Sequence, residues 1–188
     1  MKILKLLIAL CLIVSITSCS KDDNGTTPAD AQSIIGTWSL NMLQADIDLS
    51  GTFNSIPFQG TARSVGENFD YTITFTETNY TSQGSYDIVT TGTVNGIPLD
   101  EDRQTIVEEA STNTYSFNNG SIEFDANAFE FESQDISFSD PSDLQEYDVA
   151  FDSNGNLIMT QVIETTVEQD GIPITTSVDA RIVLSPVQ

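Results

Sequence analysis

The chain has 188 residues, with 28 aspartates and glutamates against 6 lysines and arginines, no histidine and 2 cysteines, so its formal net charge is -22. The lack of histidine excludes Ser-His-Asp triads, Cys-His pairs and imidazole metal sites. So much negative charge repels phosphate backbones, so the composition predicts no nucleic-acid partner. We therefore expect a protein that is not an enzyme and that has no catalytic residues, no cofactor and no metal site.

Residues 1–18 predict a secretory signal peptide. Lys2 and Lys5 are the only charged residues in this segment, and an apolar run from Ile3 to Ile16 leads to the small residues Thr17-Ser18. About 14 apolar positions are too few to cross a hydrocarbon core of roughly 30 Å as a helix. A basic start, a short apolar stretch and small residues before the cut are typical of a segment that is removed.

The end of this segment, Ile16-Thr17-Ser18-Cys19, resembles the lipobox of bacterial lipoproteins. In that family the cysteine thiol carries a diacylglycerol, and the new N-terminus is acylated, typically with palmitate. The resemblance implies cleavage before Cys19 and a membrane anchor of several lipid chains on that residue, which makes attachment effectively permanent. The alternative is cleavage after an ordinary small residue, with Cys19 as the last part of the signal peptide.

Residues 19–33 predict a flexible tether. Ser20, Lys21, Asp22 and Asp23 resemble the Lys-acidic-acidic export signal of surface lipoproteins in the Bacteroidota, and a serine after the cysteine resembles outer-membrane lipoproteins. The alternative is that these four are ordinary polar residues. The resemblance implies a lipid-anchored protein of the outer membrane, exposed at the cell surface. The remaining tether is rich in Asp, Asn, Gly, Thr and Pro, a composition typical of flexible segments.

Residues 34–188 predict a single all-β domain. β-branched and aromatic residues alternate with polar ones, and no apolar stripe keeps helical spacing for three turns. Between Phe131 and Ile136 the apolar positions change parity, which predicts a bulge or turn near Ser133. In chain order, the alternating residues expected to face the core are Trp38, Leu40, Met42, Phe69, Tyr71, Ile73, Phe75, Ile122, Phe124, Phe129, Phe131, Tyr147, Val149, Phe151, Ile172, Ile174, Val178, Ala180, Ile182 and Leu184.

Turn signals separate these segments. Asn118-Asn119-Gly120 and Asn154-Gly155 tolerate positive φ and predict tight hairpins. A related pattern occurs as Asn54-Ser55-Ile56-Pro57-Phe58, as Asn95-Gly96-Ile97-Pro98-Leu99 and as Asp170-Gly171-Ile172-Pro173-Ile174, and it predicts three further hairpin tips. Strands joined in this way form an antiparallel up-and-down meander, and closing the meander into a barrel would hide its edges.

Asp152-Ser153-Asn154-Gly155-Asn156 places oxygen-bearing side chains two residues apart, as at the start of a calcium loop. However, Leu157 occupies the position where such a loop needs glycine, and Ile163 stands where it needs a bidentate glutamate. The segment therefore favours a hairpin.

The first strand of the domain carries a second resemblance. Gly36-Thr37-Trp38 follows the tether and resembles the Gly-x-Trp motif of the lipocalin superfamily, and the whole domain is similar to lipocalin-like domains of Bacteroidota lipoproteins. The resemblance implies a lipocalin-like β-barrel with an apolar-lined mouth, in which Gly36 and Trp38 close one end. It also implies that an arginine from the last strand, here Arg181, packs over the indole as a cation–π lid.

Two alternatives remain open at this point. Arg181 alternates with the apolar residues Ala180 and Ile182, so the lid requires a bulge at the strand end. The alternative fold is a β-sandwich, in which Trp38 is an ordinary core aromatic on an edge strand.

Two functions of different classes fit these expectations. In the first, the barrel binds a small apolar or amphipathic molecule, or a glycan fragment, at the cell surface. In the second, the protein is an accessory or structural subunit whose acidic wall contacts another envelope protein and whose barrel is filled by its own Phe and Ile side chains. A continuous cavity above about 300 Å³ would favour binding, whereas a tight core would favour the accessory subunit.

Overall fold

The computed structural model describes residues 26–126, 128–129, 146–169 and 172–187, which form strands and turns only and confirm the predicted all-β class. Within these residues, no helix has the length and apolar character needed to cross a membrane. The strands are β1 (Thr27–Pro28), β2 (Gly36–Phe53), β3 (Ile56–Phe75), β4 (Asn79–Val94), β5 (Ile97–Pro98), β6 (Asp102–Asn118), β7 (Ser121–Phe124), β8 (Glu146–Phe151), β9 (Leu157–Gln169) and β10 (Ile172–Pro186).

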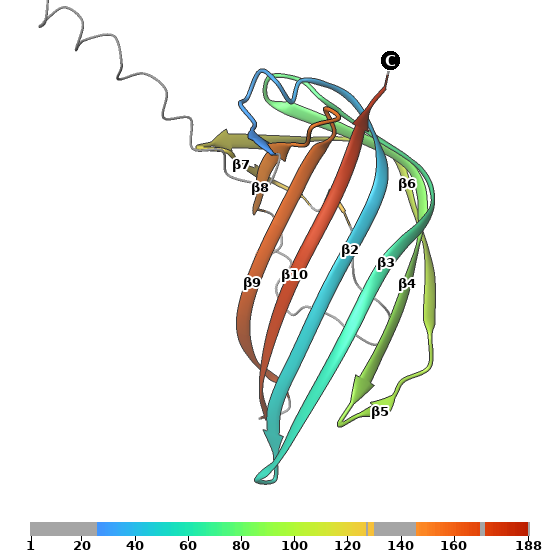
Figure 1. The fold of residues 1–188 in the computed structure, drawn as a ribbon, viewed down its shortest axis with the longest axis vertical. Coiled ribbons are helices and arrows are strands. Elements are labelled where there is room, and N and C mark those ends of the chain that lie inside the picture. The colour runs from blue at the N-terminus through green and yellow to red at the C-terminus, as the bar shows by residue number, and fades with distance from the viewer. Residues whose placement is uncertain (1–25, 127, 130–145, 170–171, 188) are drawn as a thin grey trace, which may run out of the picture.

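Except for β1 and β5, these strands are hydrogen-bonded in a closed antiparallel ring (Figure 1). Each strand pairs with the next along the chain, β4 pairs with β6, and the last strand β10 pairs with the first long strand β2. The short strand β5 pairs with the end of β4, and β1 pairs with the end of β8. The predicted up-and-down meander is therefore confirmed. Both a barrel and a sandwich of two sheets are consistent with this ring.

A β-bulge changes which residues of β2 face the interior. Asn41 is an extra residue relative to the pairing of β2 with β10. Leu40, before it, and Leu43, after it, are both buried, whereas Met42 is only half-buried. The expected inward position of Met42 is therefore wrong, because the bulge shifts the inward face from even to odd residues.

Elsewhere the predicted alternation is confirmed for the described residues. Phe69, Phe151, Ile172 and Ile174 are half-buried. Phe131, Ser133 and Ile136 lie outside the described residues. The expected core residues that are buried are Trp38, Leu40, Tyr71, Ile73, Phe75, Ile122, Phe124, Phe129, Tyr147, Val149, Val178, Ala180, Ile182 and Leu184.

The predicted turns also occur where the chain is described. Asn119 and Gly120 have φ values of 52° and 88°, and Gly155 has a φ of 81°. The tip between β2 and β3 has positive φ at Asn54 and Ser55. The tip of β4 has positive φ at Asn95-Gly96. Asp170 and Gly171 lie outside the described residues, but Gln169 pairs directly with Ile172 across the connection between β9 and β10.

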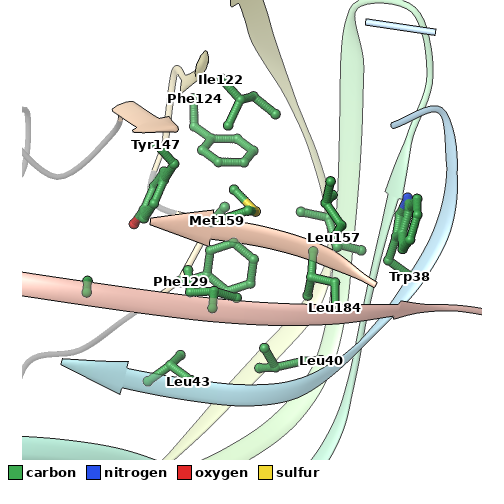
Figure 2. Packing of buried hydrophobic residues seen from close by; sticks show 14 of the residues in the cluster. Trp38, Leu40, Leu43, Ile122, Phe124, Phe129, Tyr147, Leu157, Met159 and Leu184 are labelled. Carbon is green, nitrogen blue, oxygen red and sulfur yellow. The ribbon is translucent and has the colours of Figure 1, made fainter. Parts of the chain in front are cut away.

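Aromatic side chains fill one half of the interior, which we call the packed end and which is formed around Phe124 and Trp38 (Figure 2). The ring centroid of Phe124 lies 4.9 Å from that of Tyr80 and 5.9 Å from that of Tyr147. Phe129 lies in a bend rather than on the expected strand, and its ring contacts those of Phe124 and Tyr147 at 6.3 and 6.4 Å. The packed end is therefore filled by the chain itself.

Two buried tyrosines hold the segment that follows β7. The hydroxyl of Tyr80 donates a hydrogen bond to the carbonyl oxygen of Ala126 at 2.9 Å. The hydroxyl of Tyr71 lies 2.8 Å from the carbonyl oxygen of Ala128 and 2.5 Å from Oε2 of Glu108, so its single hydrogen is shared between two acceptors. These bonds fix the backbone that carries Phe129 into the interior.

Burial also keeps these phenols neutral. It raises the pKa of Tyr71, with the hydrogen bond to Glu108 as a second cause, and it raises the pKa of Tyr80 to about 12. The pKa of Tyr147, which is fully enclosed, is likewise raised by burial. The neutral form of each phenol is therefore favoured in the folded state.

Raised phenol pKa values predict alkaline unfolding. Above about pH 10 the unfolded chain ionises its tyrosines while Tyr71 and Tyr147 stay protonated in the fold. The stabilising contribution of these two phenols is therefore fully present below about pH 10. Above that pH, each of the two residues should lower the free energy of unfolding by about 1.4 kcal/mol per pH unit. Denaturant titrations from about pH 8 to 11 measure this slope, and Tyr147→Phe should reduce it. An unfolding free energy that stays constant over that range would contradict it.

Candidate functional site

The repeated Ile-Pro motifs gather at the end of the ring opposite Trp38 (Figure 1). We call this the tip end; it consists of the β2–β3 tip at Phe53–Ile56, the β4–β5 tip at Val94–Ile97 and the paired ends of β9 and β10 at Gln169 and Ile172. The long strands of these hairpins extend well beyond the short strands β7 and β8. The three motifs therefore share one location, which the sequence alone did not reveal.

Cross-strand pairing places the apolar side chains of the tip end on the interior face. Leu49 pairs with Thr176 of β10 and with Gly60 of β3. Gly60 pairs with Val94, which in turn pairs with Ile97. Directly paired residues lie on one face of a sheet, and Thr176 is buried. This row of five residues therefore faces the interior.

Most of the exposed apolar surface belongs to this same face. Phe53 and Ile56 pair with each other and alternate in phase with Leu49. Leu99 lies opposite Gly92, and its N–H donates to the Gly92 carbonyl oxygen at 2.9 Å. Of the nine exposed large apolar side chains among the described residues, five lie here: Phe53, Ile56, Val94, Ile97 and Leu99.

A cavity of about 410 Å³ lies within the tip end, and we call it the tip cavity. Its size is in the range of small-molecule sites. A side chain at Gly92 would place its Cβ 2.6 Å from the carbonyl oxygen of Thr61, so the close approach of β3 and β4 requires glycine there. The inward-facing residues of its lining are Leu49, Ala62, Thr90, Gly92, Val94 and Leu99, joined at the mouth by Asp100 and Asp102.

Trp38 occupies the packed end as a core residue. It is 6% exposed, its Nε1 donates to the carbonyl oxygen of Ile34 at 2.8 Å, and its ring lies 5.9 Å from that of Phe151. Gly36 has a φ of 143°, a conformation that favours glycine at the start of β2. Gly36 and Trp38 therefore lie at one end of the ring, and their role in closing a lipocalin-like barrel stays a prediction.

The expected arginine lid is wrong for Arg181. This residue is exposed and alternates with the buried residues Ala180 and Ile182, so its side chain lies on the outer face of β10. Trp38 pairs with Pro186, roughly 17 Å further along β10 at about 3.4 Å per residue. Arg181 and the indole therefore lie on opposite faces, and the bulge at Asn41 of β2, opposite the end of β10, does not bring them together.

Arg181 instead borders a hollow of about 800 Å³ on the outer surface, beside β1. Asp148 and Thr160 line the same hollow, and Asp148 accepts a hydrogen bond from Ser121 at 2.8 Å. Arg181 takes part in none of the ion pairs formed among the described residues. Because this hollow carries charges of both signs on an outer face, the tip cavity is the better candidate for an apolar ligand.

Several expected features are turns or lie outside the described residues. Asp152 Oδ1 accepts hydrogen bonds from the backbone N–H groups of Asn154 and Asn156, and the bonds from Asn156 are the main cause that lowers the pKa of Asp152. The segment is thus the hairpin turn that was expected. No cluster of three or more metal-ligating side chains occurs in the described part of the chain. Cys19 and residues 20–23 lie outside it, so their roles stay predictions.

Sequence reasoning missed the tip cavity. It identified the Ile-Pro motifs as turns but did not single out Leu49, Ala62, Thr90 or Gly92. A signal was available, since small residues at inward positions of β3 and β4 leave space inside a closed ring. Comparisons of the chain with known protein families, with curated proteins and with solved structures find no match.

Proposed function

We propose that this protein is a lipid-anchored component of the outer membrane, exposed at the cell surface, that binds a small apolar or amphipathic molecule in the tip cavity. The observation that carries the proposal is the apolar inner face of the tip end. Five large apolar side chains stay exposed there, around a cavity of about 410 Å³. Soluble proteins rarely leave such surface uncovered without a binding role.

The apolar surface of the tip cavity supplies a favourable contribution to the free energy of binding. Apolar surface that a ligand covers contributes roughly 25 cal/mol per Å², and the ligand's own apolar surface adds to this. The carboxylates of Asp100 and Asp102 give the mouth a polar border. An apolar body with a polar head therefore fits the site better than a wholly polar glycan.

The place where the described chain begins supports binding away from the membrane. The described chain begins at Thr26, beside β1 at the packed end, whereas the tips lie at the other end of the ring (Figure 1). β2 alone, from Gly36 to Phe53, spans roughly 55 Å at about 3.3 Å per residue. A lipid on Cys19 would therefore leave the tip cavity facing outward.

The binding test uses the neutral fluorescent probe N-phenyl-1-naphthylamine, displaced by dodecyl maltoside. Ile97→Asn with Leu99→Asn removes two exposed apolar side chains of the tip end at little cost to folding; Leu99 lines the cavity and Ile97 lies on the same face. The double variant should weaken probe binding roughly 5- to 30-fold, the equivalent of about 1 to 2 kcal/mol. The matched control is Val107→Asn with Val162→Asn, which removes two exposed valines elsewhere on the surface. Equal affinities in the two variants would refute the site, and displacement by maltose alone would indicate a glycan ligand.

The anchor is tested by Cys19→Ala. Without the thiol no diacylglycerol can be attached, so the protein should leave the membrane fraction or fail to mature. Mass spectrometry of the wild-type N-terminus should find the acyl chains on Cys19. Membrane fractionation that is unchanged by the substitution, together with an unmodified cysteine, would disprove the anchor.

A second candidate function is favoured by the packed end. Phe124, Phe129 and Tyr147 fill that half of the interior, as expected of an accessory subunit with a self-filled barrel. Such a subunit would contact another envelope protein through its acidic surface. Chemical crosslinking on intact cells, followed by mass spectrometry, separates the two: a specific crosslinked protein without probe binding favours the accessory role.

A further inference from the structure

We infer that the tip cavity selects amphipathic ligands with a positively charged head, such as an alkylammonium group, and rejects those with an anionic head. This inference rests on the proposed function, because it names the chemical class of the ligand at the same site. It follows from the charges that border the cavity and from where the cationic side chains of the chain lie.

Both charged residues that line the tip cavity are carboxylates. Asp102 pairs directly with Thr90, which is buried, so the two residues share the inner face of the sheet. Asp100 lies two residues before it and borders the same cavity. A ligand whose apolar chain contacts Leu49, Val94 and Leu99 would therefore place its head beside two negative charges.

The arginines of the described chain lie elsewhere. Arg63 is exposed between the buried residues Ala62 and Ser64, so it belongs to the outer face, where it pairs with Asp46 at 3.6 Å. Arg103 is likewise exposed, next to the inward-facing Asp102, and it pairs with Glu67 at 3.0 Å. None of the cations in the described ranges lines the tip cavity, so none is placed to receive an anionic head.

The apolar surroundings of the tip cavity strengthen the electrostatic effect of Asp100 and Asp102 on a ligand head. The attraction between a cationic head and a carboxylate is less screened beside an apolar wall than in bulk water. An anionic head meets repulsion from Asp100 and Asp102 and also from a chain whose net charge is -22. A neutral head experiences neither effect, so its affinity is the reference against which the effect of head charge is measured.

The test compares dodecyltrimethylammonium, dodecyl maltoside and dodecyl sulfate, which share one alkyl chain and differ in the charge of the head. Each displaces N-phenyl-1-naphthylamine below its micelle concentration, with circular dichroism as the check on folding. We expect the cation to bind at least roughly 10-fold more tightly than the anion, with the maltoside between them and the difference shrinking at high salt. Equal affinities for the cation and the anion would overturn the inference.

Charge variants separate the cavity from the general field of the protein. Asp100→Asn with Asp102→Asn should remove most of the difference in affinity between the cation and the anion. The matched control, Asp48→Asn with Asp179→Asn, removes two exposed carboxylates from the outer face and should keep the preference. If both variants lose the preference for the cation equally, the net charge of the protein causes the preference and the inference is overturned. If none of the three detergents, the neutral maltoside included, binds the wild-type protein, the proposed function itself is wrong.

Discussion

Closure of the strands into a ring decides what the interior can hold, because alternate residues of every strand must share one enclosed space. Where those residues are aromatic, as at Phe75, Tyr80 and Phe124, the space is filled. Where they are small, as at Ala62 and Gly92, a cavity remains. One continuous sheet therefore contains a packed end that supplies stability and a tip end with room for a ligand.

A polar arrangement of three hydroxyls around Glu108 lies beside the aromatic residues of the packed end. Glu108 accepts hydrogen bonds from Ser82 at 2.6 Å, from Ser111 at 2.8 Å and from Tyr71 at 2.5 Å, so one half-buried carboxylate is satisfied by three hydroxyls. The same tyrosine holds the carbonyl oxygen of Ala128 and so fixes Phe129 inside the packed end. Glu108 therefore has a structural role, and its environment differs from that of the two aspartates at the tip cavity.

The sequence predicted most of the fold, because alternation and turn chemistry are local properties. Tyr71, Ile73 and Phe75 face the core as their spacing requires, and Asn119-Gly120 forms the expected turn. The prediction that Met42 faces inward was wrong. The bulge at Asn41 depends on the register of β2 against β10, and the local sequence contains no signal for it.

The candidate site could be predicted only in part. Alternation along β10 correctly indicated an outward side chain for Arg181, and this local rule prevailed over the lid that the family resemblance implied. The tip cavity combines Leu49, Ala62, Thr90 and Leu99, which lie on four separate segments of the chain. Their proximity depends on long-range strand pairing, which no local pattern contains.

A methyl NMR titration with dodecyl maltoside tests most directly whether the ring has one filled half and one half that binds ligands. Ligand entry at the tip end should shift the methyl signals of Leu49, Val94 and Leu99 and leave those of Leu157, Met159 and Leu184 at the packed end unchanged. Shifts confined to the packed end, or no shifts at saturating ligand, would contradict this division of the interior.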